Sequence, residues 1–123
     1  MQIGITKKQI EISKIKTIHG ADYYHAKKME KAYIEAGKKW IFPPIMLVRN
    51  MKGDGYYCID GIHRTRTRKR LGFKKITAYV LDSVRISMKD VREGNVNRLW
   101  QCSEFVDKDG NNYLNLIKDS LLY

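Results

Sequence analysis

The stretch that decides the fold is YYCIDGIHRTRTRKRLGF, residues 56–73. Its apolar beginning is typical of a buried strand, and the basic segment that follows predicts a short helix. The first N–H groups of a helix have no intrahelical partners, and the helix dipole is positive at that end. Gly61 has no Cβ, and His63 and Arg64 add donors, so an anion could approach the backbone closely here. The sequence therefore predicts a phosphate-binding site where the strand turns into the helix.

The residues of this turn have distinct candidate roles. Asp60 and His63 are the candidate catalytic residues, and Asp60 is also the candidate metal ligand because carboxylate oxygens suit Mg²⁺. Other roles stay open: Asp60 as a helix N-cap or as the partner that orients Arg64, and His63 as a phosphate donor, a proton carrier or a structural residue. The expected phosphate- or nucleotide-binding residues are Gly61, Ile62, His63, Arg64 and Thr65. An Arg64→Ala variant is expected to lose phosphate binding and to keep the fold.

The helix after this turn is strongly basic. Its candidate nucleic-acid contacts are Arg66, Arg68, Lys69 and Arg70. Each like-charge pair destabilises an isolated helix by about 0.2–0.5 kcal/mol, and contact with a polyanion would offset that repulsion. The whole chain has 24 Lys and Arg against 13 Asp and Glu, a formal net charge of +11, which favours phosphate-bearing partners. The alternative is a solvated basic face whose charge serves solubility.

Composition narrows the class of protein. A chain of 123 residues with 43% hydrophobic residues has enough apolar side chains for one domain with a modest core. Two cysteines, Cys58 and Cys102, are too few for a disulfide scaffold, so a reducing cytoplasm is the expected location. Neither a signal peptide nor an apolar run of the roughly 20 residues needed to span a bilayer is visible. The small size and the many lysines fit a phage or mobile-element protein.

The remaining segments predict a mixed α/β fold. The expected elements of the core are a short strand beginning at Gln9, a helix between Asp22 and Gly37, a hairpin of strands 45–50 and 56–59, and a strand at 74–82. The expected elements after it are a helix interrupted near Gly94, a strand that begins at 104, and a final helix over 111–123. We therefore divide the chain into a domain at 1–82 and a C-terminal extension at 83–123 packed on it.

The order of these elements and the motif resemble the ParB/sulfiredoxin superfamily, in particular its ParB-like nuclease-domain branch. Members carry PI.V and then Y.V.DGHHR..A...LG...I...V. The matching pieces here, within about residues 8–82, are Pro44-Ile45, Tyr57, Asp60-Gly61, His63-Arg64, Leu71-Gly72 and Ile76. The resemblance implies a ParB/sulfiredoxin-like mixed sheet and a cradle in which Gly61, His63 and Arg64 contact the phosphate of a nucleotide or of DNA.

Departures from the pattern limit the activity. Sulfiredoxins are similar but carry a nucleophilic cysteine where this chain has Ile62, so thiol-dependent repair of peroxiredoxins is not expected. Cys58 lies on the predicted strand and is expected to be a small buried hydrophobe. Free amino-acid kinases of the same fold carry D-G-H-H-R, and Ile62 replaces the first histidine of that pair. Chromosome-segregation ParB proteins carry G-E-R-R and add a helix-turn-helix domain, for which this chain is too short.

Three functions stay open at this point. The first is a DNA-associated ParB-like domain with a nucleotide- or phosphate-binding pocket, which could also act as a metal-dependent nuclease. The second is a nucleotide-dependent kinase of a small amino-acid-type compound, and the third is a non-catalytic nucleic-acid-binding module. The implied cofactors of an enzyme are ATP, ADP or CTP with Mg²⁺, and the partners are DNA or a nucleotide. His19 and Asp22, before the first helix, are second-rank site residues. A homodimer through the C-terminal tail is left open.

Overall fold

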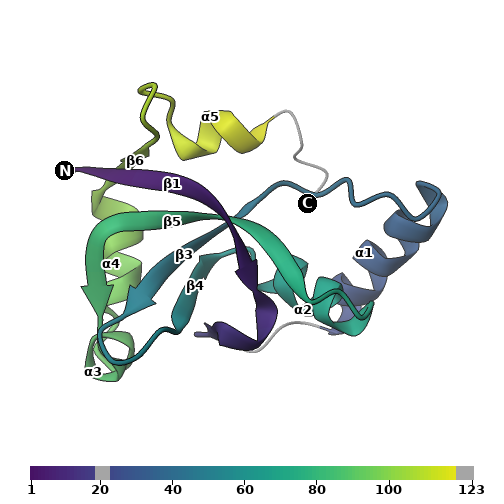
Figure 1. Cartoon of the computed structure of the whole chain (residues 1–123), viewed down its shortest axis with the longest axis horizontal. Coiled ribbons are helices and arrows are strands. Elements are labelled where there is room, and N and C mark those ends of the chain that lie inside the picture. Colours follow the sequence, from purple (N-terminus) through teal and green to yellow (C-terminus); the bar gives the residue numbers. More distant parts are fainter. Residues whose placement is uncertain (19–22, 119–123) are drawn as a thin grey trace.

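The computed structural model describes residues 1–18 and 23–118, which form a six-stranded mixed sheet with helices packed around it (Figure 1). The strands run in the order β2-β4-β3-β5-β1-β6. Their bounds are Gln2–Glu11 (β1), Ile15–Thr17 (β2), Ile45–Asn50 (β3), Tyr56–Asp60 (β4), Lys75–Ile86 (β5) and Glu104–Val106 (β6). The helices are Tyr23–Glu35 (α1), Ile62–Arg70 (α2), Met88–Arg92 (α3), Asn95–Cys102 (α4) and Tyr113–Ile117 (α5), and a 3₁₀ turn, Ile12–Lys14 (η1), separates β1 from β2.

The sheet has a hydrophobic core on each face because its central strands are apolar at successive positions. In β3, Met46 and Val48 belong to one core cluster, whereas Ile45 and Leu47 belong to the other. Figure 1 shows α1 and α2 together at one end of the sheet and α3 and α4 at the other. Since α2 directly follows β4, the turn between them lies where the sheet meets the α1–α2 pair.

Most predicted elements are present. Residues 45–50 form β3 and pair antiparallel with β4 as the predicted hairpin, and α2 begins at Ile62. Gly94 interrupts the predicted helix by taking a left-handed conformation between α3 and α4. Two strands are longer than expected: β1 begins at Gln2 rather than Gln9, and β5 continues to Ile86 rather than ending at 82. The first residues of β1 pair with β6, and those from Ile5 onward pair with β5 over seven residue pairs. The end of β5 pairs in parallel with β3, where Ile86 lies opposite Asn50.

The C-terminal segment adds to the same sheet. Strand β6 pairs in parallel with the start of β1, and Phe105 lies opposite Ile3. Tyr113 and Ile117 of α5 enter the core cluster on that face. The division at residue 82 stays a prediction, since β5 runs through that position. Among the described residues, no helix is long and apolar enough to cross a membrane.

Candidate functional site

Gly61 forms the corner between β4 and α2. It precedes the first helical residue with φ +103°, ψ 29°, a backbone conformation that disfavours a side chain. A Cβ built on Gly61 would lie 2.8 Å from the Cβ of Ile45 and 3.1 Å from Nε of Arg64. The missing side chain therefore makes room for the core residue Ile45. Gly61 also lines the cavity described below, so the approach of an anion to its backbone stays a prediction.

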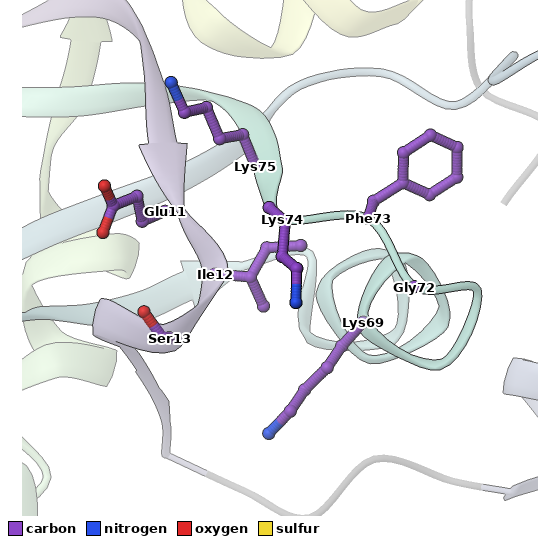
Figure 2. A pocket seen from close by; sticks show the side chains of 8 residues that line it. All are labelled: Glu11, Ile12, Ser13, Lys69, Gly72, Phe73, Lys74 and Lys75. Atoms are coloured by element: carbon purple, nitrogen blue, oxygen red, sulfur yellow. The ribbon is translucent and has the colours of Figure 1, made fainter.

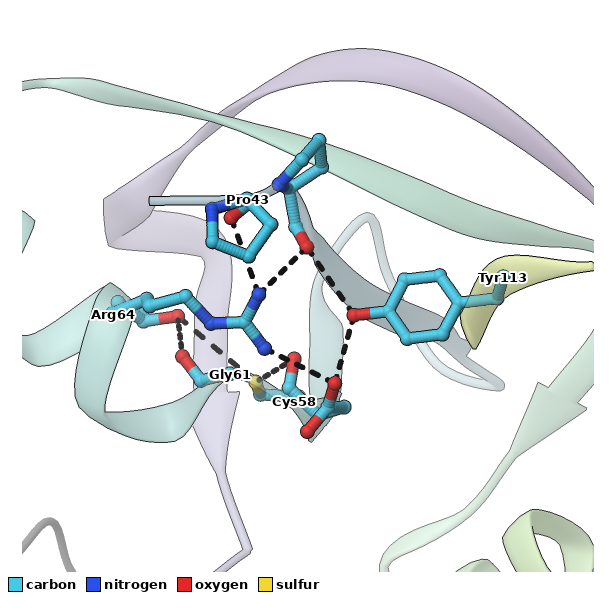
Figure 3. A network of polar contacts seen from close by, with 8 residues as sticks. Pro43, Cys58, Gly61, Arg64 and Tyr113 are labelled. Atoms are coloured by element: carbon cyan, nitrogen blue, oxygen red, sulfur yellow. Dashed lines mark hydrogen bonds and ion pairs between the residues drawn. The ribbon is translucent and has the colours of Figure 1, made fainter. Parts of the chain in front are cut away.

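Arg64 points into the protein from the first turn of α2 (Figure 3). Nη1 donates to the backbone carbonyls of Pro43 at 3.2 Å and Pro44 at 2.9 Å, while Nη2 pairs with Oδ2 of Asp60 at 3.0 Å. The Arg64 side chain is 8% exposed and that of Asp60 is 33% exposed. The guanidinium thus ties α2 to the segment that enters β3, and its two terminal nitrogens are occupied within the chain.

Tyr113 completes this network from the C-terminal segment. Its hydroxyl lies 2.8 Å from Oδ2 of Asp60 and 3.2 Å from the carbonyl oxygen of Pro44 (Figure 3). Burial raises the pKa of the Tyr113 hydroxyl, and the neighbouring Asp60 carboxylate raises it further. The phenol therefore stays protonated and donates to Asp60. The sequence placed Tyr113 on an apolar helix stripe and gave no sign of this polar contact.

A Tyr113→Phe variant should lower the free energy of unfolding by about 1–2 kcal/mol, because the partly buried Asp60 oxygen loses a donor while the ring remains. Chemical denaturation followed by circular dichroism measures this difference. Tyr33→Phe is the control, since it removes a hydroxyl from a tyrosine ring that is only half-buried and should change stability by less than about 0.5 kcal/mol. Equal stability of the two variants would show that the Tyr113 hydroxyl does not support Asp60.

A cavity of about 270 Å³ lies beside the start of α2. The residues of the motif that line the cavity are Asp60, Gly61, Ile62, His63 and Arg64. Helix α1 contributes His25 and Met29 to the same lining. The imidazole rings of His25 and His63 lie with centroids 4.9 Å apart. The first turn of α2 has no side-chain cap and no acidic residue. Amide and imidazole donors therefore face one hollow that an anion could fill.

His25 is a second site residue that the sequence did not indicate. It lies in the first turns of α1, where nothing in YYHAKK distinguishes it from a surface residue. Its place in the site depends on the packing of α1 against α2, which local pattern does not show. The second-rank candidates His19 and Asp22 lie outside the described residues. Within the described part of the chain, no three His, Cys, Asp or Glu side chains gather as a metal site.

Thr65 and Cys58 lie behind the turn rather than in the cavity. Thr65, predicted to bind phosphate, is buried and donates to the Gly61 carbonyl at 2.9 Å. Cys58 lies 4.0 Å from the Thr65 hydroxyl, and burial raises the pKa of its thiol to about 12. Cys58 is thus the buried hydrophobe that the sequence predicted, and it stays protonated at neutral pH.

The four predicted nucleic-acid contacts on α2 do not form one exposed face. The Arg68 guanidinium lies over the rings of Phe73 and Trp40, at 4.1 and 4.8 Å, and donates to the Lys75 carbonyl at 2.6 Å. Arg70 forms an ion pair with Glu30 at 2.6 Å. Arg66, Lys69 and Arg70 are exposed, whereas Arg68 is half-buried. Trp40 and Phe42 pack against each other at 5.0 Å, within an aromatic cluster that also includes Phe73.

Comparison with known proteins agrees with this architecture. The family model described as the ParB N-terminal domain matches residues 3–91. The chain belongs to the ParB N-terminal domain family. A Pnob8-like ParB-N domain superposes with a TM-score of 0.50 at 20% identity, covering 80% of this chain and 37% of that one. The ParB/sulfiredoxin-like mixed α/β fold predicted from the motif is therefore confirmed.

Two further relatives are similar to this ParB N-terminal domain. A free serine kinase, solved in complex with AMP, superposes with a TM-score of 0.56 at 25% identity over 62% of this chain and 31% of that one. The uncharacterized protein MJ0188 of Methanocaldococcus jannaschii is 24% identical over 94% of this chain and 44% of its own length. The chain thus spans less than half the length of either relative.

Proposed function

We propose that this domain binds the phosphate group of a nucleotide at the start of α2, between His63 and His25. The observation that carries the proposal is the cavity of about 270 Å³, in which both imidazoles and the uncapped first turn of α2 meet. A cavity of this size holds part of a nucleotide, so its base would extend from the opening. The structure of the free serine kinase with AMP is consistent with this proposal.

Charge in the cavity favours an anion. Among the described residues that line it, the one carboxylate is that of Asp60, which pairs with Arg64 and accepts a hydrogen bond from Tyr113 through the same oxygen, Oδ2. Oδ1 of Asp60 is then the oxygen that a cation or a substrate hydroxyl could reach. Arg64 acts by holding Asp60 and the corner in place, and His63 is the residue that we expect to contact phosphate.

A His63→Ala variant should bind nucleotides at least about tenfold more weakly, because a donor to a charged phosphate contributes about 1.5–3 kcal/mol. Isothermal titration with AMP, ADP, ATP and CTP, with and without Mg²⁺, measures the affinity. Arg66→Ala, which removes an exposed charge from the same helix, is the control and should change affinity less than about threefold. Failure of all four nucleotides to bind, or equal losses in both variants, would contradict the proposal.

Transfer of a phosphoryl group to a small amino-acid-type compound is a second candidate function. The 25% identity with the free serine kinase favours it, and Oδ1 of Asp60 offers a base beside the phosphate. Incubation with ATP or ADP and free serine, followed by phosphorus NMR, tests it, and no phosphorylated product would count against it. One residue counts against a kinase: Ile62 occupies the position at which such kinases carry a histidine.

The other hypotheses rest on weaker support. Contact with DNA is supported by the net charge of +11, and nuclease activity with Mg²⁺ bound at Asp60 has only that carboxylate in its favour.

Cys58 and Cys102 are free thiols, which is consistent with the proposed reducing cytoplasm.

A further inference from the structure

Two basic hollows lie on either side of the turn η1, away from the first turn of α2. The first, the lysine hollow, has a volume of about 680 Å³ and is lined by Glu11, Ile12, Ser13, Lys69, Gly72, Phe73, Lys74 and Lys75. In Figure 2, Lys69 and Lys74 extend to the same side of the ribbon, whereas Lys75 extends to the opposite side and the Phe73 ring turns away. Lys69 and Lys74 are therefore its main donors.

The second, the arginine hollow, has a volume of about 230 Å³ and is lined by Lys14, Arg49, Gly53, Asp54, Gly55, Tyr56 and Arg85. Arg49 and Arg85 are register partners on neighbouring parallel strands, β3 and β5. Like charges directly opposite each other destabilise a sheet. The Arg49 guanidinium lies 5.6 Å from the ring centroid of Tyr56. The carboxylate of Asp54 pairs with Lys14 at 3.1 Å.

Positive charge exceeds negative charge in both hollows: in the described lining of each, three cations meet one carboxylate, that of Glu11 or Asp54. Elsewhere in the chain, cations such as Arg64 and Arg70 have carboxylate partners. Among the ion pairs found within residues 1–18 and 23–118, none includes Lys69, Lys74, Arg49 or Arg85. An external anion would offset the repulsion in both hollows.

We propose that the two hollows form one track for the sugar–phosphate backbone of a nucleic-acid strand, which crosses η1. Ser13 lines the lysine hollow and the next residue, Lys14, lines the arginine hollow, so the two adjoin along the chain. The ion pair of Lys14 with Asp54 and the pairing of Ile15 with Tyr56 hold η1 beside the β3–β4 turn. A ligand with successive phosphates fills both hollows, whereas a single nucleotide fills one.

The test is fluorescence anisotropy with labelled single-stranded and double-stranded DNA between low and moderate salt. Each phosphate contact contributes about −0.9 to the slope of log K against log salt on duplex DNA and about −0.7 on single strands. The double variants Lys69→Ala/Lys74→Ala and Arg49→Ala/Arg85→Ala should each make this slope shallower by about 1.5–2 on the form of DNA that binds. Thermal unfolding curves check that the variants fold.

Lys7→Ala/Lys108→Ala is the matched control, because it removes two charges from the lining of a different cavity and should leave the slope unchanged. The proposal would be overturned if neither Lys69→Ala/Lys74→Ala nor Arg49→Ala/Arg85→Ala changed the salt slope more than this control does. It would also be overturned if the wild-type protein bound neither form of DNA at low salt. His63→Ala should bind DNA like wild type, so failure of the nucleotide site and failure of the track are distinguishable.

Discussion

An Arg64→Ala variant is expected to lose about 3 kcal/mol of folding free energy. Truncation of one partner of a buried ion pair costs about 3–5 kcal/mol, and the lower end applies because Asp60 remains one-third exposed and keeps the Tyr113 hydroxyl. The Pro43 carbonyl also loses the donor that binds it. Urea denaturation followed by circular dichroism measures the loss. This expectation replaces the one drawn from the sequence, in which the variant keeps its fold and loses only ligand binding.

Two companion variants separate the causes. Arg66→Ala removes an exposed arginine from the same helix and should stay within about 0.5 kcal/mol of wild type. Arg64→Lys keeps the charge but lacks the planar fork that reaches two carbonyls and a carboxylate, so it should recover less than half of the loss. If Arg64→Ala were as stable as Arg66→Ala but could not bind nucleotide, Arg64 would contact the ligand, as the sequence first suggested.

The fold was predictable where short-range signals are strong. Two prolines before residue 45 and the glycines at 53 and 55 bound an apolar run, and β3 occupies the stretch between them. The start of β1 was missed because its middle is exposed and carries Lys7 and Lys8. The pairing of β1 with β5 and β6 is what makes the segment a strand, and that pairing is not local in sequence.

The site was predictable only in part for a similar reason. The sequence left open that Asp60 is the partner that orients Arg64, and the two do pair. The direction of Arg64 depends on carbonyls at Pro43 and Pro44, and the second donor to Asp60 comes from Tyr113, 53 residues away. Such partners are set by the packing of β3 and α5 around the corner, so a motif identifies the corner without showing which side chains fill it.

A Gly61→Ala variant should be destabilised by roughly 3 kcal/mol, from two separable causes. A positive φ costs a non-glycine residue about 1–2 kcal/mol, and Gly61 has φ +103°. The new methyl group would also overlap Ile45, a fully buried core residue, and overpacking of a core typically costs about 1–3 kcal/mol. The corner should therefore move, and with it the His63 imidazole that faces the cavity.

Gly94→Ala isolates the backbone part of this cost, since Gly94 also has a positive φ, +74°, but nothing lies within 4 Å of its Cβ position. We expect it to lose about 1 kcal/mol. The steric part is measured by introducing Gly61→Ala into an Ile45→Ala background, where the added methyl group gains room and the two changes should couple favourably by at least about 1 kcal/mol. Additive losses, or a Gly61→Ala cost no larger than that of Gly94→Ala, would show that Ile45 does not fix the corner. The requirement for glycine in this motif would then have to come from the ligand side, where the sequence first placed it.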